Sequence, residues 1–309
     1  MWPTLDIRLL RHFVAVAEEL HFGRAATRLF VAQQALSRDV RRLEERAGVL
    51  LLDRTSRRVS LTPAGERLLP RARQLLALHD ETVRDLRGDD SALLVNVVAP
   101  GLTPARVLAA ARRLDPATEF FARFDGGLDR AGTLLRERRL HATFGRWDPA
   151  ADAFAHRLVR WEPMALLVPE RSPLAARPAV ALAELRDAGV CFLAGDHVTP
   201  EWEDAAVRLL RSCGADAGNG PAHPYVHSIE ELAHHVRARD SPVLTLLDQP
   251  PVPGAVLRPL VEPGAVYPWS LVWRRGEPAP RGLRALLRAA DELAVADGWL
   301  TPPPGAWRP

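Results

Sequence analysis

Lysine is absent from this 309-residue chain, so all 41 basic side chains are arginine, which we interpret as coding bias first and nucleic-acid chemistry second. Cysteine is nearly absent: Cys191 and Cys213 are too few for a disulfide framework and fit a reducing compartment. The chain also lacks a signal-peptide core and any apolar run near the length of a membrane span. We therefore expect a cytoplasmic protein with no membrane partner.

The charge is unevenly distributed along the chain. Residues 1–87 hold 16 arginines against 11 acidic residues, a formal charge of +5, whereas the remainder carries −2. A length of 309 residues suits two or three domains. The basic excess therefore predicts that the N-terminal part meets DNA.

Residues 22–42 have the pattern of two short helices joined by a tight turn. Small apolar residues mark one face of the first helix: Ala25, Ala26 and Leu29. An inward stripe with helical spacing marks the second: Leu36, Val40 and Leu43. Phe30 and Val31 fall at the turn, where we expect them to fill the space between the helices. The pattern predicts a helix-turn-helix.

The outward face of the second helix is rich in side chains that bind DNA: Gln33, Gln34, Ser37, Arg38, Arg41 and Arg42. Glutamine and arginine form paired hydrogen bonds with base edges in the major groove, and arginine also neutralises phosphate. The alternative is an ordinary helical hairpin with a solvated basic face.

A winged domain is predicted around this motif. Residues 5–20 form a supporting helix, and short strands at 49–52 and 59–61 flank a polar tip. Three arginines lie where the tip would touch the DNA backbone or minor groove: Arg54, Arg57 and Arg58. This DNA-binding domain would cover residues 1–62.

A long helix follows, with Thr62 as its N-cap and Pro63 as its first residue. It runs to about Arg87 within a linker of residues 63–90. One nearly continuous stripe faces a single side: Leu68, Leu69, Ala72, Leu75, Leu76, His79, Val83 and Leu86. We interpret it as a dimerisation helix, with Leu76 facing the partner; the alternative is packing against its own domain.

From Ala92 the chain alternates strands with helices. Strands are expected at residues 93–99, 119–124, 142–144, 164–168, 190–193, 243–247 and 270–273. Helices are expected at 104–114, 128–139, 182–185, 201–213, 228–239 and 281–297. This order is typical of parallel, doubly wound α/β sheets, which bind ligands beyond the carboxyl ends of their strands. The proline-rich residues 302–309 would be a tail.

The chain resembles LysR-type transcriptional regulators over essentially its whole length. The N-terminal resemblance rests on Phe22, Ala25-Ala26, Gln33-Gln34-Ala35-Leu36-Ser37-Arg38, Arg42-Leu43-Glu44, Arg54-Thr55 and Leu61-Thr62-Pro63-Ala64-Gly65. A looser C-terminal match rests on residues 93–103, Pro173-Leu174-Ala175, Pro268-Trp269 and Trp273-Arg274.

The resemblance implies a winged helix-turn-helix, a linker helix and a two-lobed α/β effector domain like a periplasmic binding protein. The effector domain would cover residues 91–301. Its first lobe would comprise about 91–162 and 267–301, and its second about 163–266. Such regulators bind interrupted inverted repeats of double-stranded DNA as dimers or tetramers and respond to a small molecule. RNA polymerase is a further candidate partner, and no cofactor is implied.

Two positions depart from the family pattern. Ala32-Gln33-Gln34 replaces the usual Ser-Gln-Pro, so position 32 offers no capping oxygen, at a cost of roughly 1 kcal/mol. Gln34 adds an amide that can read bases, so an unusual operator preference is expected. His141 stands where the family usually has aspartate, which weakens any transfer of ligand chemistry from other members.

Effector contacts are expected in the loops that follow the strands: Thr103, Trp147, Asp196, His197, Thr199, Thr245 and Tyr267. Several of these would alternatively be ordinary loop residues. Their hydroxyl, indole and imidazole groups favour an aromatic or carboxylated metabolite.

Other classes of function are weaker fits. An enzyme using Asp196 and His197 would need a nucleophile, yet no nucleophile elbow or P-loop motif is present, so no catalytic residue is assigned. A metal site could draw on Cys213, His223, His227, His234 and His235, but paired cysteines are missing and surface histidines are the simpler interpretation. An architectural DNA-binding protein without a ligand remains the third alternative.

Overall fold

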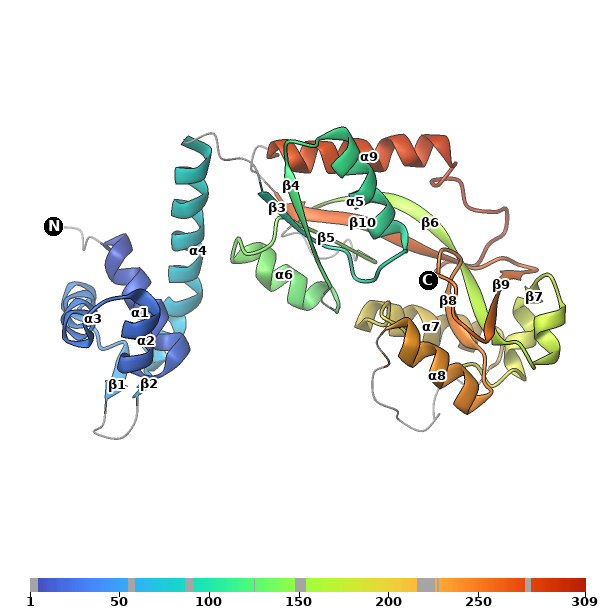
Figure 1. The fold of residues 1–309 in the computed structure, drawn as a ribbon, viewed down its shortest axis with the longest axis horizontal. Coiled ribbons are helices and arrows are strands. Elements are labelled where there is room, and N and C mark those ends of the chain that lie inside the picture. The colour runs from blue at the N-terminus through green and yellow to red at the C-terminus, as the bar shows by residue number, and fades with distance from the viewer. Residues whose placement is uncertain are drawn as a thin grey trace. The chain divides into compact units, whose positions relative to one another are not determined.

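The computed structural model describes residues 5–54, 59–86, 92–124, 126–147, 154–215, 226, 228–275 and 279–309. The chain divides into two compact units (Figure 1). The first is Met1–Asp89 with Arg136–Arg139, and the second is Asp90–Leu135 with Leu140–Pro309. Within the described residues, every helix is too short or too polar to cross a membrane.

The first unit begins with three helices around a small apolar core. They are α1 (Ile7–Glu19), α2 (Phe22–Leu29) and α3 (Gln33–Ala47). The Asp6 side chain accepts a hydrogen bond from the Arg8 amide and caps α1. The helices end at residues with left-handed backbone, Leu20, Phe30 and Gly48. Phe13, Ala25 and Leu36 are completely buried where the three helices meet, so the expected helix-turn-helix is present.

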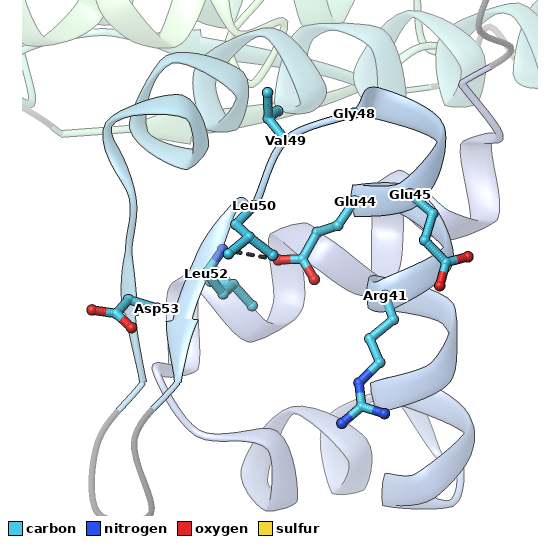
Figure 2. Close-up of a pocket in the computed structure, with 8 residues that line it drawn as sticks. All are labelled: Arg41, Glu44, Glu45, Gly48, Val49, Leu50, Leu52 and Asp53. Atoms are coloured by element: carbon cyan, nitrogen blue, oxygen red, sulfur yellow. Dashed lines mark hydrogen bonds between the residues drawn. The ribbon is translucent and has the colours of Figure 1, made fainter.

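A two-stranded wing follows, formed by antiparallel β1 (Leu52–Arg54) and β2 (Val59–Leu61). The strand expected at 49–52 therefore starts later, because Val49 and Leu50 are exposed and precede the ladder. The buried Glu44 carboxylate accepts hydrogen bonds from the backbone amides of Leu51 and Leu52, at 3.0 and 3.1 Å. This bond to Leu52, drawn in Figure 2, attaches the wing to α3.

The long helix α4 (Pro63–Leu86) is present, and the Thr62 hydroxyl accepts a hydrogen bond from the Gly65 amide at its start. Its apolar stripe divides between two directions. Ala72 and Leu76 are buried in the core of the winged domain, so the expectation that Leu76 faces a partner helix is wrong. Leu75 and Leu78 are 41% and 43% exposed and form an outward apolar edge.

The second unit combines sheet strands with helices. Its strands are β3 (Ala92–Asn96), β4 (Glu119–Arg123), β5 (Ala142–Gly145), β6 (Phe154–Pro169), β7 (Val180–Ala181), β8 (Val243–Leu246), β9 (Ala255–Val261) and β10 (Val266–Arg274). Its α-helices are α5 (Thr103–Leu114), α6 (Leu128–Arg136), α7 (Pro200–Ser212), α8 (Ile229–Arg239) and α9 (Arg281–Ala296). Two short 3₁₀ helices, η1 (Pro173–Ala176) and η2 (Leu182–Arg186), lie between them.

The sheet is mixed rather than parallel. Along it the order is β4-β3-β5-β10-β6-β9-β7, and β8 also pairs with β6. The strand pairs β3–β4, β3–β5 and β7–β9 are parallel, but β6 and β10 pair antiparallel with their neighbours. The prediction of parallel sheets was therefore wrong for the central strands. Sequence reasoning missed β9, β7 and the first ten residues of β6.

Strand β6 joins two groups of strands. Its first part pairs with β10 as far as Pro163, which lies opposite Val266. From Met164 onward it pairs with β8 and β9 instead. We call the strands β3, β4 and β5 with the facing half of β10 the first lobe, and β7, β8 and β9 with the end of β6 the second lobe.

Helices cover both faces of the first lobe, with α5 and α9 on one face and α6 on the other (Figure 1). In β3, Leu93 and Val95 pack in the core that contains α5 and α9, while Leu94 packs in the core formed by α6. In β8, Leu244 faces the core with α7, and Val243 faces α8. This two-sided burial follows from the period of two in a strand.

Two further expectations are corrected here. Residues 190–193 form no strand; Cys191 makes only an isolated bridge with Val243. Residues 302–309 are not a free tail, because Trp307 exchanges backbone hydrogen bonds with Gly264 and Val266, at 2.7 and 3.0 Å. Arg308 also lies over the Trp161 ring.

Glu44→Ala should loosen the wing, because it leaves two buried backbone amides without their acceptor. We expect a loss of about 1–3 kcal/mol in unfolding free energy and faster hydrogen exchange of the Leu51 and Leu52 amides. Glu45→Ala, which alters the neighbouring exposed acid, is the control. Equal protection of both amides in the two variants would contradict the role assigned to Glu44.

Candidate DNA-binding surface and effector site

Helix α3 separates its two faces cleanly. Leu36, Val40 and Leu43 are completely buried on the inner face. On the outer face, the exposed residues are Gln33, Gln34, Arg38, Arg41 and Arg42, while Ser37 is half-buried. The structure thus places all six predicted α3 contacts on one helix, and five of them are open to a duplex. Their role in binding DNA stays a prediction.

The start of α3 has the expected weak cap, since Ala32 provides no side-chain hydrogen bond. The turn before it differs from expectation. Phe30 does not fill the space between the helices but is 96% exposed. Its left-handed φ of 55° ends α2 and directs the ring outward, while Val31 packs partly against the core.

At the other end of α3, the surface is hollowed between this helix and the wing (Figure 2). The hollow has a volume of about 550 Å³, and Arg41 and Glu45 project from α3 on one side of it. Arg54 ends β1, but its side chain lies outside the description. Arg57 and Arg58 fall outside the described residues, so the wing contacts also stay predictions.

The predicted effector residues fall into separate groups, of which the first centres on Thr103 at the start of α5. Its hydroxyl donates to the Glu162 carboxylate at 2.6 Å. The Trp269 indole donates to the same oxygen, also at 2.6 Å, and the Asp248 amide donates to the other at 3.3 Å. Burial raises the pKa of Glu162, against the opposing charge of Arg160. The Thr103 hydroxyl is therefore occupied by a carboxylate of the chain itself.

Paired charges surround this group. Arg160 donates to Thr103 at 2.9 Å and also to Asp248. Arg106 donates to Asp248 and Asp297, each at 2.8 Å. Burial opposes ionisation of Asp248, but hydrogen bonds from Arg160 and Arg106 keep the pKa of this carboxyl below its ordinary value. Each arginine at this position thus has an acidic partner.

Both arginines also stack on one aromatic ring. The guanidinium carbons of Arg160 and Arg106 lie 4.8 and 5.0 Å from the centre of the Trp299 ring. Such cation–π contacts fix the planes of the guanidinium groups. Sequence reasoning missed Arg160, Glu162 and Trp269. The sequence signal for the first two was the charged pair Arg160 and Glu162, two positions apart, shortly before the apolar residues 164–168.

The second group contains His197, Thr199 and Tyr267. The His197 ring is 2% exposed and meets the Trp202 ring edge-on, with centroids 4.5 Å apart. Trp202 in turn contacts Tyr267 at 5.4 Å, and the Tyr267 hydroxyl interacts with Thr199. Thr199 also accepts a hydrogen bond from the Trp202 amide and caps α7.

Burial governs the ionisation of this group. It lowers the pKa of His197 to about 4. The backbone of Leu244 and the charge of Asp196 act in the opposite direction, because they favour the protonated ring. It also raises the pKa of Tyr267. Both side chains are consequently uncharged near neutral pH.

The other predicted residues lie apart. Thr245 is buried in β8 and donates to Gln249 at 3.1 Å. Asp196 accepts a hydrogen bond from the Ser228 amide. Trp147 stacks on His156, 5.4 Å between ring centres, and packs with α6. The structure therefore does not bring Trp147 to the His197 group.

Hydrogen bonds join the first lobe to α7. The Leu128 amide donates to Glu201 at 2.6 Å, and Arg146 donates to Asp204 and to the Glu201 carbonyl. Within the described ranges, no three histidine, cysteine or acidic side chains gather around a metal position. His223 and His227 lie outside these ranges.

Comparison with known proteins identifies both parts of the chain. Residues 7–66 match the model for bacterial regulatory helix-turn-helix proteins of the lysR family, and residues 95–294 match the LysR substrate binding domain.

Individual relatives agree with this assignment. The Escherichia coli K12 regulator OxyR is 30% identical over 89% of this chain and 91% of its own length. The uncharacterized E. coli K12 regulator YnfL is 33% identical over 67% and 72%. Among solved structures, full-length CbnR complexed with its target DNA has a TM-score of 0.66, covering 93% of this chain and 99% of that chain at 23% identity, which shows the shared fold.

The lowered pKa of His197 predicts a pH-dependent stability. Because the unfolded ring binds a proton below about pH 6.5 and the folded ring only below about 4, unfolding free energy is lost as pH falls from 6.5 to 4. His197→Phe should show a smaller loss over this window in urea titrations at several pH values. The exposed His234→Phe is the control, and identical pH profiles for His197→Phe and wild type would contradict the prediction.

Proposed function

This chain belongs to the LysR family, and we propose that it controls transcription by binding an interrupted inverted repeat through α3 and the wing. It is a DNA-binding transcriptional regulator with an effector-binding domain, not an enzyme. The observation that carries the proposal is the exposed glutamine–arginine face of α3 opposite three fully buried core residues. Since operators lie on chromosomal DNA, the proposal implies action in the cytoplasm.

We assign base reading to Gln33, Gln34 and Arg38, and backbone contacts to Arg41, Arg42 and the wing arginines. Glutamine and arginine in the first turns of a recognition helix reach base edges, whereas later residues reach phosphates. The solved complex of the structurally similar CbnR with its target DNA supports this use of the fold.

Oligomerisation is assigned to α4. The inner side of α4 packs in its own domain, and Leu75 and Leu78 are exposed on its outer side. Two exposed leucines on a long helix are a suitable contact for a partner helix. A symmetric pair of such helices would present two recognition helices to two half-sites. We propose a dimer or tetramer on this basis.

The effector is assigned to the lobes of the second unit, where β6 and β10 pass between them. We keep 1–62 as the DNA-binding domain and 63–90 as the linker helix, and we extend the effector domain from 91–301 to 309, because Trp307 bonds to Gly264 and Val266. We also propose RNA polymerase as the partner through which the bound regulator acts, since regulation of transcription needs such a contact.

Arg38→Ala tests the reading face. A duplex selected by the wild-type protein from a random library is the probe. We expect a loss of about 1–3 kcal/mol in binding and relaxed base preference at one position of each half-site. Fluorescence anisotropy measures both. Arg288→Ala, an exposed arginine on α9, is the control; wild-type affinity in Arg38→Ala would remove Arg38 from the reading face.

Leu78→Glu tests the oligomer. A charge at an apolar contact between helices should separate the subunits, halving or quartering the mass measured by light scattering. Val295→Glu changes an 85% exposed apolar residue on α9 and should keep the wild-type mass. A Leu78→Glu protein with unchanged mass would exclude this edge of α4 from the interface.

A further inference from the structure

Phe30 is the most exposed large apolar side chain in the described part of the chain, at 96%. It lies in the turn between α2 and α3, three residues before Gln33, where the recognition helix begins. Exposure alone is ordinary for a single apolar residue. The backbone that carries this ring is not ordinary.

The backbone of Phe30 is left-handed, with φ 55° and ψ 41°. This conformation ends α2, because the Phe30 amide donates to the carbonyl oxygens of Ala26 and Thr27. Glycine or asparagine ends a helix in this way at a lower cost, and a bulky side chain is disfavoured there. The fold therefore gains little from a phenyl ring at this position. Residues that break a local rule in this way are concentrated at functional sites.

The ring borders a hollow that continues onto the outer face of α3. The hollow has a volume of about 980 Å³, and Phe30, Val31 and Gln33 are among the residues that line it. The opposite lining comes from the segment that begins α2, and a side chain at Gly23 would lie 3.5 Å from the Gln33 amide oxygen. Phe30 and Gln33 thus border the same space, so a duplex that reaches Gln33 also reaches the ring.

The arginines at this hollow already have acidic partners. Arg24 donates to the Glu19 carboxylate at 3.3 Å, and Arg28 donates to the Glu18 carboxylate at 2.8 Å. A phosphate would have to compete with these carboxylates, so contact with a duplex is apolar rather than ionic at this end of α3. The apolar group that the bases present in the major groove is the C5-methyl group of thymine, which phenylalanine can contact.

We propose that Phe30 is a specificity-determining residue, whose ring packs on the C5-methyl group of a thymine near the bases that Gln33 contacts. This inference rests on the proposed DNA-binding function and extends the reading face from α3 into the turn before it. Three residues span at most about 10 Å, and successive bases of one strand lie about 3.4 Å apart. The thymine therefore lies within about three base pairs of the Gln33 contact.

Deoxyuridine isolates this contact, because it differs from thymidine only in lacking the methyl group. Each thymine of the selected duplex is replaced by uracil, one position at a time, and affinity is measured by fluorescence anisotropy. At one position of each half-site the wild type should lose affinity about fourfold, the value of one buried methyl group. Phe30→Gly should bind the parent duplex roughly fivefold to tenfold more weakly and should lose nothing further at that position.

Leu20→Gly is the matched control. Leu20 also ends a helix with a left-handed φ of 46° and is 47% exposed, but it lies between α1 and α2. This variant should keep the affinity and the uracil sensitivity of the wild type. Melting temperatures test for a structural role. Because glycine suits a left-handed, exposed position, a marked fall in Phe30→Gly would show that the ring packs within the fold and would overturn the proposal.

The remaining outcomes also decide the matter. Wild-type affinity in Phe30→Gly would overturn the proposal, as would an equal sensitivity to uracil in both proteins at every position. Either result still requires that the wild type binds the duplex, so the proposed function would stand and only the role of Phe30 would fail. If the wild type binds no duplex, the proposed function itself fails.

Discussion

One buried carboxylate ties together the strands and helices on which the second unit depends. Glu162 lies on β6 directly before that strand changes partners from β10 to β8, and it accepts hydrogen bonds from α5, β10 and the segment after β8. A buried charge without such donors would cost several kcal/mol, so these three elements must keep their positions around it. The junction between the lobes is therefore fixed by polar contacts as well as by strand pairing.

The DNA-binding part was largely predictable from the sequence, because its helices are amphipathic and the spacing of apolar residues within each helix shows its buried face. The period of Leu36, Val40 and Leu43 fixes which face of α3 is inward, and the outward face follows. Two details were not predictable. Phe30 points to solvent because a left-handed residue ends α2, and Leu76 points inward because α4 packs on α1. Both depend on tertiary geometry that side-chain type alone does not report.

The effector region was predictable as a set of loops but not as a set of contacts. Placing Thr103 after a buried strand needed only the alternation of strands and helices. The strand expected before His197 is absent, because Cys191 makes only an isolated bridge there. Glu162 and Arg160, the partners of Thr103, come from β6, far away in sequence. The antiparallel pairing of β6 and β10 was missed, because a continuous apolar run has the same sequence pattern in parallel and antiparallel sheets. Without β6, the pairing of Thr103 with Glu162 could not be foreseen.

The two groups near the junction differ in how their polar atoms are held. Around Glu162, donors from α5, β10 and the segment after β8 meet at one carboxylate, so that group ties distant elements together. Around His197, burial dominates and lowers the pKa of the ring, although the Leu244 backbone and the charge of Asp196 favour its protonated form. The first group therefore fixes the strands at the junction, whereas the second makes the folded state sensitive to acid.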